Sequence, residues 1–239
     1  MKRLVESHQQ HFLKHTEFIA ELIGHSNIRP RDTVIDIGAG SGAISAVLAR
    51  RAKHVIAYEN EPSAAKKLRD NMRRCKNVEV IEADFLSSSL PAIPYKVFAN
   101  IPFSHSSAIV RRLTEAEAAP RAIYLIVQKQ FARKLLVEGD HFHGALGMSI
   151  APWWQVRIRR PLRRTDFTPP PAVDTVLLEI KLREDALLPR EQRAAFGSFV
   201  SRCYADPQFY TSCRATEDKK PSQLRLSDWI NLFTYLSKD

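Results

Sequence analysis

The sequence TVIDIGAGSG at residues 33–42 decides the fold of this chain. Its first five residues form a short apolar run that predicts a buried strand, and three glycines follow at alternate positions. Glycine turns without a Cβ clash and lets a ligand approach the backbone closely. Ile44, Val47 and Leu48 then recur at helical spacing. A strand, a glycine turn and a helix in this order predict the first unit of a nucleotide-binding α/β domain.

Strand and helix patterns continue to alternate along the chain. Apolar runs predict strands at residues 55–58, 78–81, 95–99 and 122–127. Helical spacing predicts helices over residues 12–23, from Pro62, over 106–113 and over 129–137. This alternation predicts a parallel sheet with helices on both faces. Two further strands, at residues 154–160 and 175–181, are expected to form an antiparallel pair at one edge.

The strand pattern stops after about Arg183. Helical spacing returns over residues 192–204 and 223–236. We therefore expect a Rossmann-like α/β domain over residues 1–182 and a small helical domain over residues 183–239.

Composition narrows the class of protein. The chain has 239 residues and a formal net charge of +10, which favours a polyanionic partner, although a solvated surface gives the same charge. Three cysteines, Cys75, Cys203 and Cys213, form neither a disulfide framework nor a CxxC motif. The polar start lacks a signal-peptide core, and no apolar run approaches the roughly 18 residues of a membrane span. We expect a cytoplasmic protein with no membrane contact and no metal.

The glycine turn indicates a particular cofactor. A dinucleotide fingerprint needs glycine at position 43, where this chain has Ala43. GxGxG after a strand ending near Asp36 suits S-adenosylmethionine better, because its neutral amino-acid moiety needs less phosphate cradling. A tight turn without a ligand is the alternative. Glu59, about 20 residues further on, is placed to accept hydrogen bonds from both ribose hydroxyls. Asp84 follows the third strand and is placed to accept from the adenine amine; taken alone it suggests a helix cap.

Asn100-Ile101-Pro102-Phe103 is the strongest candidate for chemistry. It follows a strand, so it belongs to the sheet edge where α/β folds bind ligands. The side-chain carbonyl of Asn100 and the main-chain carbonyl of Ile101 suit the two hydrogens of an adenine amine, whose lone pair they would direct at a methyl donor. Pro102 holds the turn rigid, and Phe103 offers a face for base stacking. A packed Asx turn is the alternative for an isolated NxPF.

In this order the motifs resemble the rRNA adenine N6-methyltransferases, which include macrolide–lincosamide–streptogramin B resistance enzymes and small-subunit rRNA dimethyladenosine transferases. The resemblance runs from about Gln9 to Lys181. Besides the stretches above, it is carried by Gln10-His11-Phe12-Leu13, by Gln128-Lys129-Gln130-Phe131-Ala132 and by residues 167–175, FTPPPAVDT. His11, Asn60 and Gln130 depart from the commoner asparagine, apolar residue and glutamate.

The resemblance implies a set of site residues and a substrate. The cofactor-binding residues are Gln10, His11, Leu13, Asp36, Gly38, Gly40, Gly42, Glu59, Asn60, Asp84, Phe85 and Asn100, and the catalytic residues are Asn100, Ile101, Pro102 and Phe103. NIPF is typical of the resistance enzymes, whereas the small-subunit enzymes usually carry NLPY. The resemblance therefore implies methylation of an adenine in 23S rRNA, or in a precursor particle, by a monomer that confers resistance.

Arginine and lysine side chains near the predicted catalytic edge are candidates for RNA binding. Arg157 and Arg159 are expected to share one strand face, with Arg160 pointing away. A charged edge strand protected from aggregation is the alternative. The full set of candidates is Arg111, Arg112, Arg133, Lys134, Arg157, Arg159, Arg160, Arg163 and Arg164. The helical domain is a further candidate for RNA binding.

Three other functions remain open at this point. A 16S rRNA adenine dimethyltransferase acting in ribosome assembly shares the chemistry. A DNA adenine methyltransferase usually has NPPY or DPPY and a separate target-recognition domain. A non-catalytic nucleic-acid-binding relative would keep the fold, but the intact Asn100, Phe103 and Glu59 argue against it.

Overall fold

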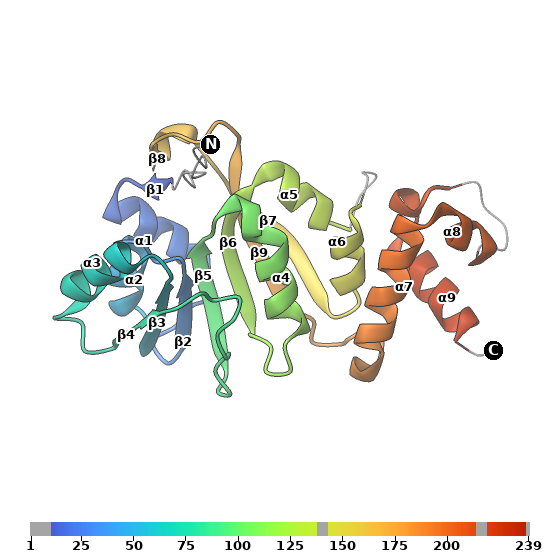
Figure 1. The fold of residues 1–239 in the computed structure, drawn as a ribbon, viewed down its shortest axis with the longest axis horizontal. Helices are drawn as coiled ribbons and strands as arrows, with labels where there is room; N and C mark the ends of the chain where they lie inside the picture. Colours follow the sequence, from blue (N-terminus) through green and yellow to red (C-terminus); the bar gives the residue numbers. More distant parts are fainter. Residues whose placement is uncertain (1–10, 138–142, 214–218, 238–239) are drawn as a thin grey trace, which may run out of the picture.

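The computed structural model describes residues 11–137, 143–213 and 219–237. Its centre is a seven-stranded sheet in the order β4-β3-β2-β5-β6-β9-β7 (Figure 1). Parallel pairing joins the first five strands, whereas β9 runs antiparallel to both β6 and β7. The strands are β2 (Thr33–Ile37), β3 (His54–Glu59), β4 (Val78–Glu82), β5 (Tyr95–Asn100), β6 (Ala122–Gln128), β7 (Trp154–Leu162) and β9 (Thr175–Leu182). The predicted α/β sheet with an antiparallel edge pair is confirmed.

Helices cover both faces of the sheet. Adjacent residues of β5 belong to different buried clusters: Phe98 packs with Leu22 of α1, and Val97 packs with Val110 of α4. Burial on both faces explains why the central strands read as continuous apolar runs. The helices before and between the strands are α1 (Thr16–Gly24), α2 (Ala43–Ala49), α3 (Pro62–Met72), α4 (Ser106–Glu115), α5 (Lys129–Leu135) and α6 (Ala145–Ile150).

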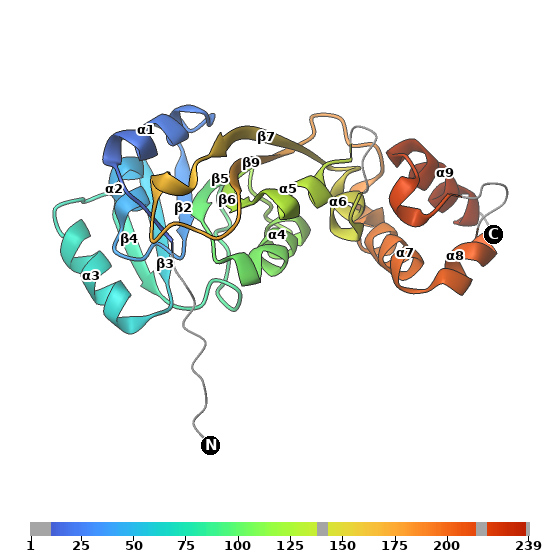
Figure 2. The same ribbon diagram turned by 90° about the horizontal axis from the view of Figure 1, so that it is seen from above.

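The last three helices lie at the end of the molecule opposite α1 to α3 (Figures 1 and 2). They are α7 (Arg193–Ala205), α8 (Pro207–Cys213) and α9 (Leu226–Leu236). Phe196 of α7 packs edge-on against Trp153 and against Phe233 of α9. All three side chains belong to the same buried cluster as one face of the sheet. The helical C-terminal region is thus confirmed, and its hydrophobic core is continuous with that of the sheet.

Two local predictions were wrong. The helix expected over residues 12–23 begins only at Thr16, because Phe12–Leu13 (β1) pair with Phe167–Thr168 (β8) as a separate two-stranded sheet. A β-bulge between Ile158 and Arg160 interrupts the alternation of β7. Arg160 therefore lies opposite Leu177, on the face where Arg159 approaches Glu179, instead of pointing away. Helices α6 and α8 were not predicted.

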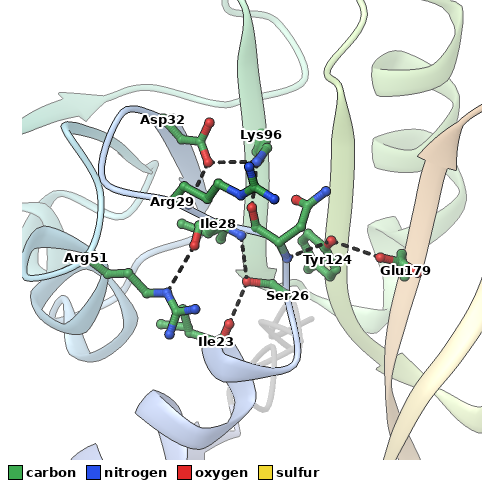
Figure 3. Close-up of polar contacts among 10 residues, drawn as sticks. Ile23, Ser26, Ile28, Arg29, Asp32, Arg51, Lys96, Tyr124 and Glu179 are labelled. Atoms are coloured by element: carbon green, nitrogen blue, oxygen red, sulfur yellow. Dashed lines mark hydrogen bonds and ion pairs between the residues drawn. The ribbon is translucent and has the colours of Figure 1, made fainter.

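Polar side chains at the amino ends of the central strands are linked in one hydrogen-bonded network (Figure 3). Nζ of Lys96 donates to Oδ2 of Asp32 and to the carbonyl of Asn27, both at 2.7 Å. The hydroxyl of Tyr124 accepts from the backbone N–H of Asn27 at 3.0 Å and donates to Oε1 of Glu179 at 2.8 Å. The network fixes the segment between α1 and β2 against β5, β6 and β9. Among the described residues, no helix is long and apolar enough to cross a membrane.

Candidate functional site

The sequence-predicted polar residues converge at the carboxyl ends of the parallel strands. Strands β2 to β5 are parallel, so the residues that follow them lie along one edge of the sheet. This edge carries the glycine turn after β2, Glu59 at the end of β3, Asp84 after β4 and Asn100 at the end of β5. Open α/β sheets bind their ligands at this edge.

The glycine turn requires glycine for two different reasons. Gly38, Gly40 and Gly42 have φ values of 67°, 56° and 95°, in the left-handed region that favours glycine. A Cβ on Gly42 would also lie 2.6 Å from Cδ1 of Leu68, so glycine lets α2 pack closely on α3. A Cβ on Gly38 would meet only Cδ of Pro102, at 3.8 Å. The turn after β2 is therefore next to the NIPF segment after β5.

Glu59 connects the glycine turn to β3. Its Oε2 accepts from the backbone N–H of Gly40 at 2.7 Å, and its Oε1 accepts from that of Glu61 at 2.9 Å. Each carboxylate oxygen has a second lone pair for another donor. Only 1% of the residue is exposed, so a ligand reaches this carboxylate only if the glycine turn moves aside.

Asp36 lies beneath the glycine turn. The residue is 1% exposed, and its Oδ2 accepts from the hydroxyl of Ser45 at 2.6 Å. Burial raises the pKa of Asp36 to about 7, against the hydrogen bond from Ser45 and with the added repulsion of Glu59. The structure thus gives Asp36 a contact within the protein, and no exposed surface for a ligand.

Asp84 and Phe85 form the next part of the edge. Asp84 is exposed, and its Oδ1 accepts from the backbone N–H of Leu86 at 2.9 Å, which is an Asx turn. Phe85 is buried and packs edge-on against Tyr58 at 5.3 Å between ring centroids. Asn60, directly after Glu59, is exposed. Asp84 therefore exposes its carboxylate next to the buried ring of Phe85.

Asn100 has a fixed amide orientation. Its Nδ2 donates to the main-chain carbonyl of His11 at 2.6 Å. This bond uses the donor end of the amide, so Oδ1 remains available as an acceptor. Among the described residues, no donor is bonded to Oδ1 of Asn100 or to the carbonyl of Ile101. Phe103 is half-buried and stacks on the ring of His11, with centroids 5.9 Å apart.

His11 also joins the site to a segment far along the chain. Its Nδ1 lies 2.8 Å from the carbonyl oxygen of Pro169, and β1 pairs with β8 just before that proline. Residues 11–13, 100–103 and 167–169 thus meet at one place. In the sequence, the FTPPP segment carries the family resemblance and its prolines predict a stiff connector, but no motif placed Pro169 in the site. Its only signal was that stretch, because the contact joins residues 158 positions apart.

Two further cofactor candidates, Leu13 and Gln10, were predicted from the sequence. Leu13 is 7% exposed and belongs to the buried cluster that contains α1 and α2. Gln10 lies outside the described residues. In the part of the chain that the structure describes, no three His, Cys, Asp or Glu side chains are grouped as metal ligands.

Most of the arginines proposed for RNA contact are engaged within the protein. Arg159 lies 3.7 Å from Glu179, and Arg164 lies 3.5 Å from Asp174. Arg160 pairs with Glu21 of α1. On α4, Arg111 pairs with Glu115 at 3.3 Å, and Arg112 lies over the ring of Phe85. The arginine side chains of the four ion pairs are 30–54% exposed, so an RNA phosphate can compete for them.

Arg133 and Lys134 differ from the engaged arginines. They are exposed in the last turn of α5, which begins directly after β6 at the carboxyl edge. Arg157 lies opposite Glu179 in the pairing of β7 with β9. The backbone N–H of Arg163 donates to Asp166, which leaves its guanidinium out of that bond. Among the described residues, Arg133 and Lys134 form no ion pair, which leaves both available to a phosphate.

Comparison with known proteins identifies the family. The model of the ribosomal RNA adenine dimethylase family matches residues 1–208. The chain is 31% identical to ribosomal RNA small subunit methyltransferase A of Dehalococcoides mccartyi over 78% of its own length and 66% of that protein's. It is 33% identical to an rRNA methyltransferase of Streptomyces thermotolerans, over 76% of its own length and 60% of that protein's.

A solved structure extends the likeness over nearly the whole chain. The crystal structure of the 23S rRNA methyltransferase ErmE is similar with a TM-score of 0.80 and 26% identity, over 95% of this chain and 99% of that one. A dimethyladenosine transferase from Plasmodium falciparum shares the fold, with a TM-score of 0.79 and 19% identity. With this Rossmann-like methyltransferase fold and the family match over residues 1–208, the chain belongs to the ribosomal RNA adenine dimethylase family.

Proposed function

We propose that the protein transfers a methyl group from S-adenosylmethionine to the N6 amine of an adenine in 23S rRNA. The observation that carries this proposal is the pair of acceptors after β5. The bond from Nδ2 of Asn100 to His11 leaves Oδ1 free, and the carbonyl of Ile101 follows it directly. Two acceptors on adjacent residues match the two hydrogens of an exocyclic amine.

The residues of the carboxyl edge fit the proposed cofactor. S-adenosylmethionine supplies a methyl group on a sulfonium when it is bound. Glu59 would receive the ribose hydroxyls on its remaining lone pairs, after movement of the turn around Gly40. Asp84 has one carboxylate oxygen outside its Asx turn for the adenine amine. Gly38 lets that ligand lie close to the backbone beside Pro102.

The chain's own residues then prepare the amine for attack. The lone pair of an adenine amine is delocalised into the ring, which makes it a poor nucleophile. Oδ1 of Asn100 and the carbonyl of Ile101 accept its two hydrogens and direct the lone pair toward the methyl group. Phe103 stacks on the base, and Pro102 keeps the turn rigid. Orientation and fixed dipoles supply most of the rate enhancement. The electron pair of the broken S–C bond would leave with S-adenosylhomocysteine, and the methylated amine, now positively charged and acidic, would release a proton to solvent, so no strong general base is needed.

The target RNA follows from the NIPF segment and the structural likeness. Ile101 and Phe103 favour the large-subunit enzymes, and a 23S rRNA methyltransferase is similar over 95% of this chain. An adenine in paired or stacked RNA must be extruded to reach the site. We further propose that residues 1–182 carry catalysis, that the helices after residue 183 contribute to RNA binding, and that the monomer acts in the cytoplasm and confers macrolide–lincosamide–streptogramin B resistance.

A 16S rRNA target is the second candidate. It is favoured by the 31% identity with a small-subunit methyltransferase from Dehalococcoides mccartyi. The two targets share the same chemistry at Asn100, so only the choice of RNA separates them.

Methyl transfer to defined nucleic acids tests the proposal. Tritium from labelled S-adenosylmethionine should enter naked 23S rRNA, and digestion followed by mass spectrometry should place it on N6 of adenine. Transfer to 16S rRNA alone would establish the second candidate. Transfer to duplex DNA alone, or to none of these substrates, would refute both.

A further inference from the structure

A second cluster of positive charge lies at the amino ends of β3 and β4, opposite the carboxyl ends that carry the candidate site. Two loops, one between α2 and β3 and one between α3 and β4, enter β3 and β4 at their amino ends. Residues 50–54 and 73–77 contain no Asp or Glu. The exposed cations on these loops, called here the amino-edge cluster, are Arg50, Arg51, Lys53, Arg73, Arg74 and Lys76.

The amino-edge cluster differs in its pairing from Arg159 and Arg160 of β7 and from Arg164, which follows that strand. Within the described residues, none of its six cations forms an ion pair with a carboxylate, whereas Arg159, Arg160 and Arg164 all do. Arg51 uses only its Nε, which donates to the carbonyl of Ile28 at 3.1 Å. Unpaired like charges repel one another, so bringing six together costs stability unless an anion is bound there.

A cleft separates the two loops. Its volume is about 340 Å³, and it is lined by Lys53, His54, Lys76, Asn77, Val78 and Glu79. Nε2 of His54 lies 3.5 Å from Oε2 of Glu79, which is the one carboxylate in this lining. Nδ2 of Asn77 donates to the carbonyls of Ala49 and Ala52, which ties the loop before β4 to the loop before β3. Both lysines thus line one cleft, on two loops that these hydrogen bonds tie together.

We propose that the amino-edge cluster is a second RNA-binding surface that holds a phosphate backbone distant from the target adenine. Closely spaced Lys and Arg on a rigid backbone are typical of phosphate contacts that position a protein without reading sequence. Five of the six lining residues are polar or charged, which disfavours an apolar peptide or a lipid chain. This inference rests on the proposed function, because an rRNA substrate is the polyanion that would bind the amino-edge cluster.

The distance between the two edges defines which RNA reaches the cluster. β3 has six residues, and strands rise about 3.3 Å per residue, so the cluster lies roughly 20 Å from the carboxyl edge. A short hairpin centred on the target adenine engages only the carboxyl edge. A longer rRNA fragment engages both edges.

Matched charge reversals test the surface. Lys53→Glu/Lys76→Glu reverses two lysines in the cleft, and Lys66→Glu/Lys67→Glu reverses two equally exposed lysines on α3. Binding of a 23S rRNA domain and of a hairpin cut from it is measured across a salt series, without cofactor. The cleft variant should bind the domain about tenfold or more weakly at moderate salt, with a salt slope shallower by about 1.5–2.

The controls separate this surface from the proposed function. Binding of the hairpin should change equally little in both variants, and thermal unfolding should match that of the wild type. If both double variants weakened binding of the domain equally, the effect would come from overall charge and not from the cleft, and the proposal would be overturned. Unchanged binding by the cleft variant would overturn it as well. If wild type binds the domain through the cleft but methylates no RNA, the proposed function fails and the surface stands.

Discussion

The polar groups around Lys96, at the amino ends of the central strands, differ from the acceptors of Asn100 and Ile101, at the carboxyl ends, in where their partners lie. Lys96 pairs with Asp32, and Tyr124 bridges Asn27 and Glu179, so the polar atoms of this network are satisfied within the chain. At the carboxyl ends, Oδ1 of Asn100 and the carbonyl of Ile101 have no donor among the described residues. Because an unmet polar group costs stability, acceptors left open along one edge are expected where a ligand supplies the donors.

This contrast assigns different roles to the two edges. Changes in the network around Lys96 should alter the free energy of unfolding and leave turnover by folded molecules intact. Changes at Asn100 and Phe103 should alter turnover and RNA capture while stability stays nearly constant. Of the following four substitutions, those at Asn100, Lys96 and Phe103 test this division, and the one at Asp36 tests the pKa of a buried carboxylate.

Asn100→Ala should have the largest effect. It removes one of the two acceptors for the adenine amine, and loss of one positioned polar group costs about 100- to 1000-fold in turnover. Single-turnover methyl transfer measures the effect, with RNA binding and thermal unfolding as controls. Turnover equal to wild type would show that Asn100 has no part in the reaction.

Lys96→Met should destabilise the protein without slowing it. The side chains of Lys96 and Asp32 are 9% and 19% exposed, so removing the ammonium leaves a largely buried carboxylate unpaired. The expected loss in the free energy of unfolding is about 2–4 kcal/mol in urea denaturation. Asp32→Asn/Lys96→Met removes both charges and should recover much of the loss. A fall in turnover per folded molecule would contradict the division between the edges.

Asp36→Asn should change how stability depends on pH. The folded-state pKa of about 7 lies above the ordinary value of 3.8, so the folded protein binds a proton that the unfolded chain releases. Wild-type stability therefore falls as pH rises from about 4 to 7, by at most about 1.4 kcal/mol per pH unit from this group. The free energy of unfolding of the variant minus that of the wild type, measured by denaturation at several pH values, should increase over that range and level off above it. A constant difference would contradict the raised pKa.

Phe103→Ala should have the smallest effect. The ring stacks on His11 and is half-buried, so its loss removes one face for the target base with little loss of core packing. We expect a rise of about tenfold in the Michaelis constant for RNA, which corresponds to a modest stacking energy. Affinity for S-adenosylmethionine, measured by calorimetry, should stay the same. If cofactor affinity falls instead, Phe103 supports the fold and not the base.

The sequence predicted those helices and strands whose structure depends on residues close together in the chain. The strand Thr33–Ile37 was placed with its observed bounds, because a short apolar run that ends directly at a glycine turn is typical of a buried strand. Helix α3 was expected to begin at Pro62 and does so, with Glu61 as its cap. The residues after β2, β3, β4 and β5 were correctly expected along one edge, since parallel strands bring their carboxyl ends together.

Contacts between distant segments were not predictable in the same way. Phe12 and Leu13 have helical spacing with the residues after them, but pairing with β8 prevails. The bulge at Arg159 was not predicted, although Pro161 follows closely and proline within a strand is confined to edge strands and bulges. The bulge reversed the expected direction of Arg160. The orientation of Asn100 depends on the backbone carbonyl of His11, a group that every residue has and that no motif marks.

A crystal structure with S-adenosylhomocysteine and adenosine bound tests the central claim most directly. The account predicts the sulfur atom between the glycine turn and Asn100, and the adenosine amine within hydrogen-bond distance of Oδ1 of Asn100 and the carbonyl of Ile101. A nucleoside bound elsewhere, or an amine directed away from these two oxygens, would contradict it.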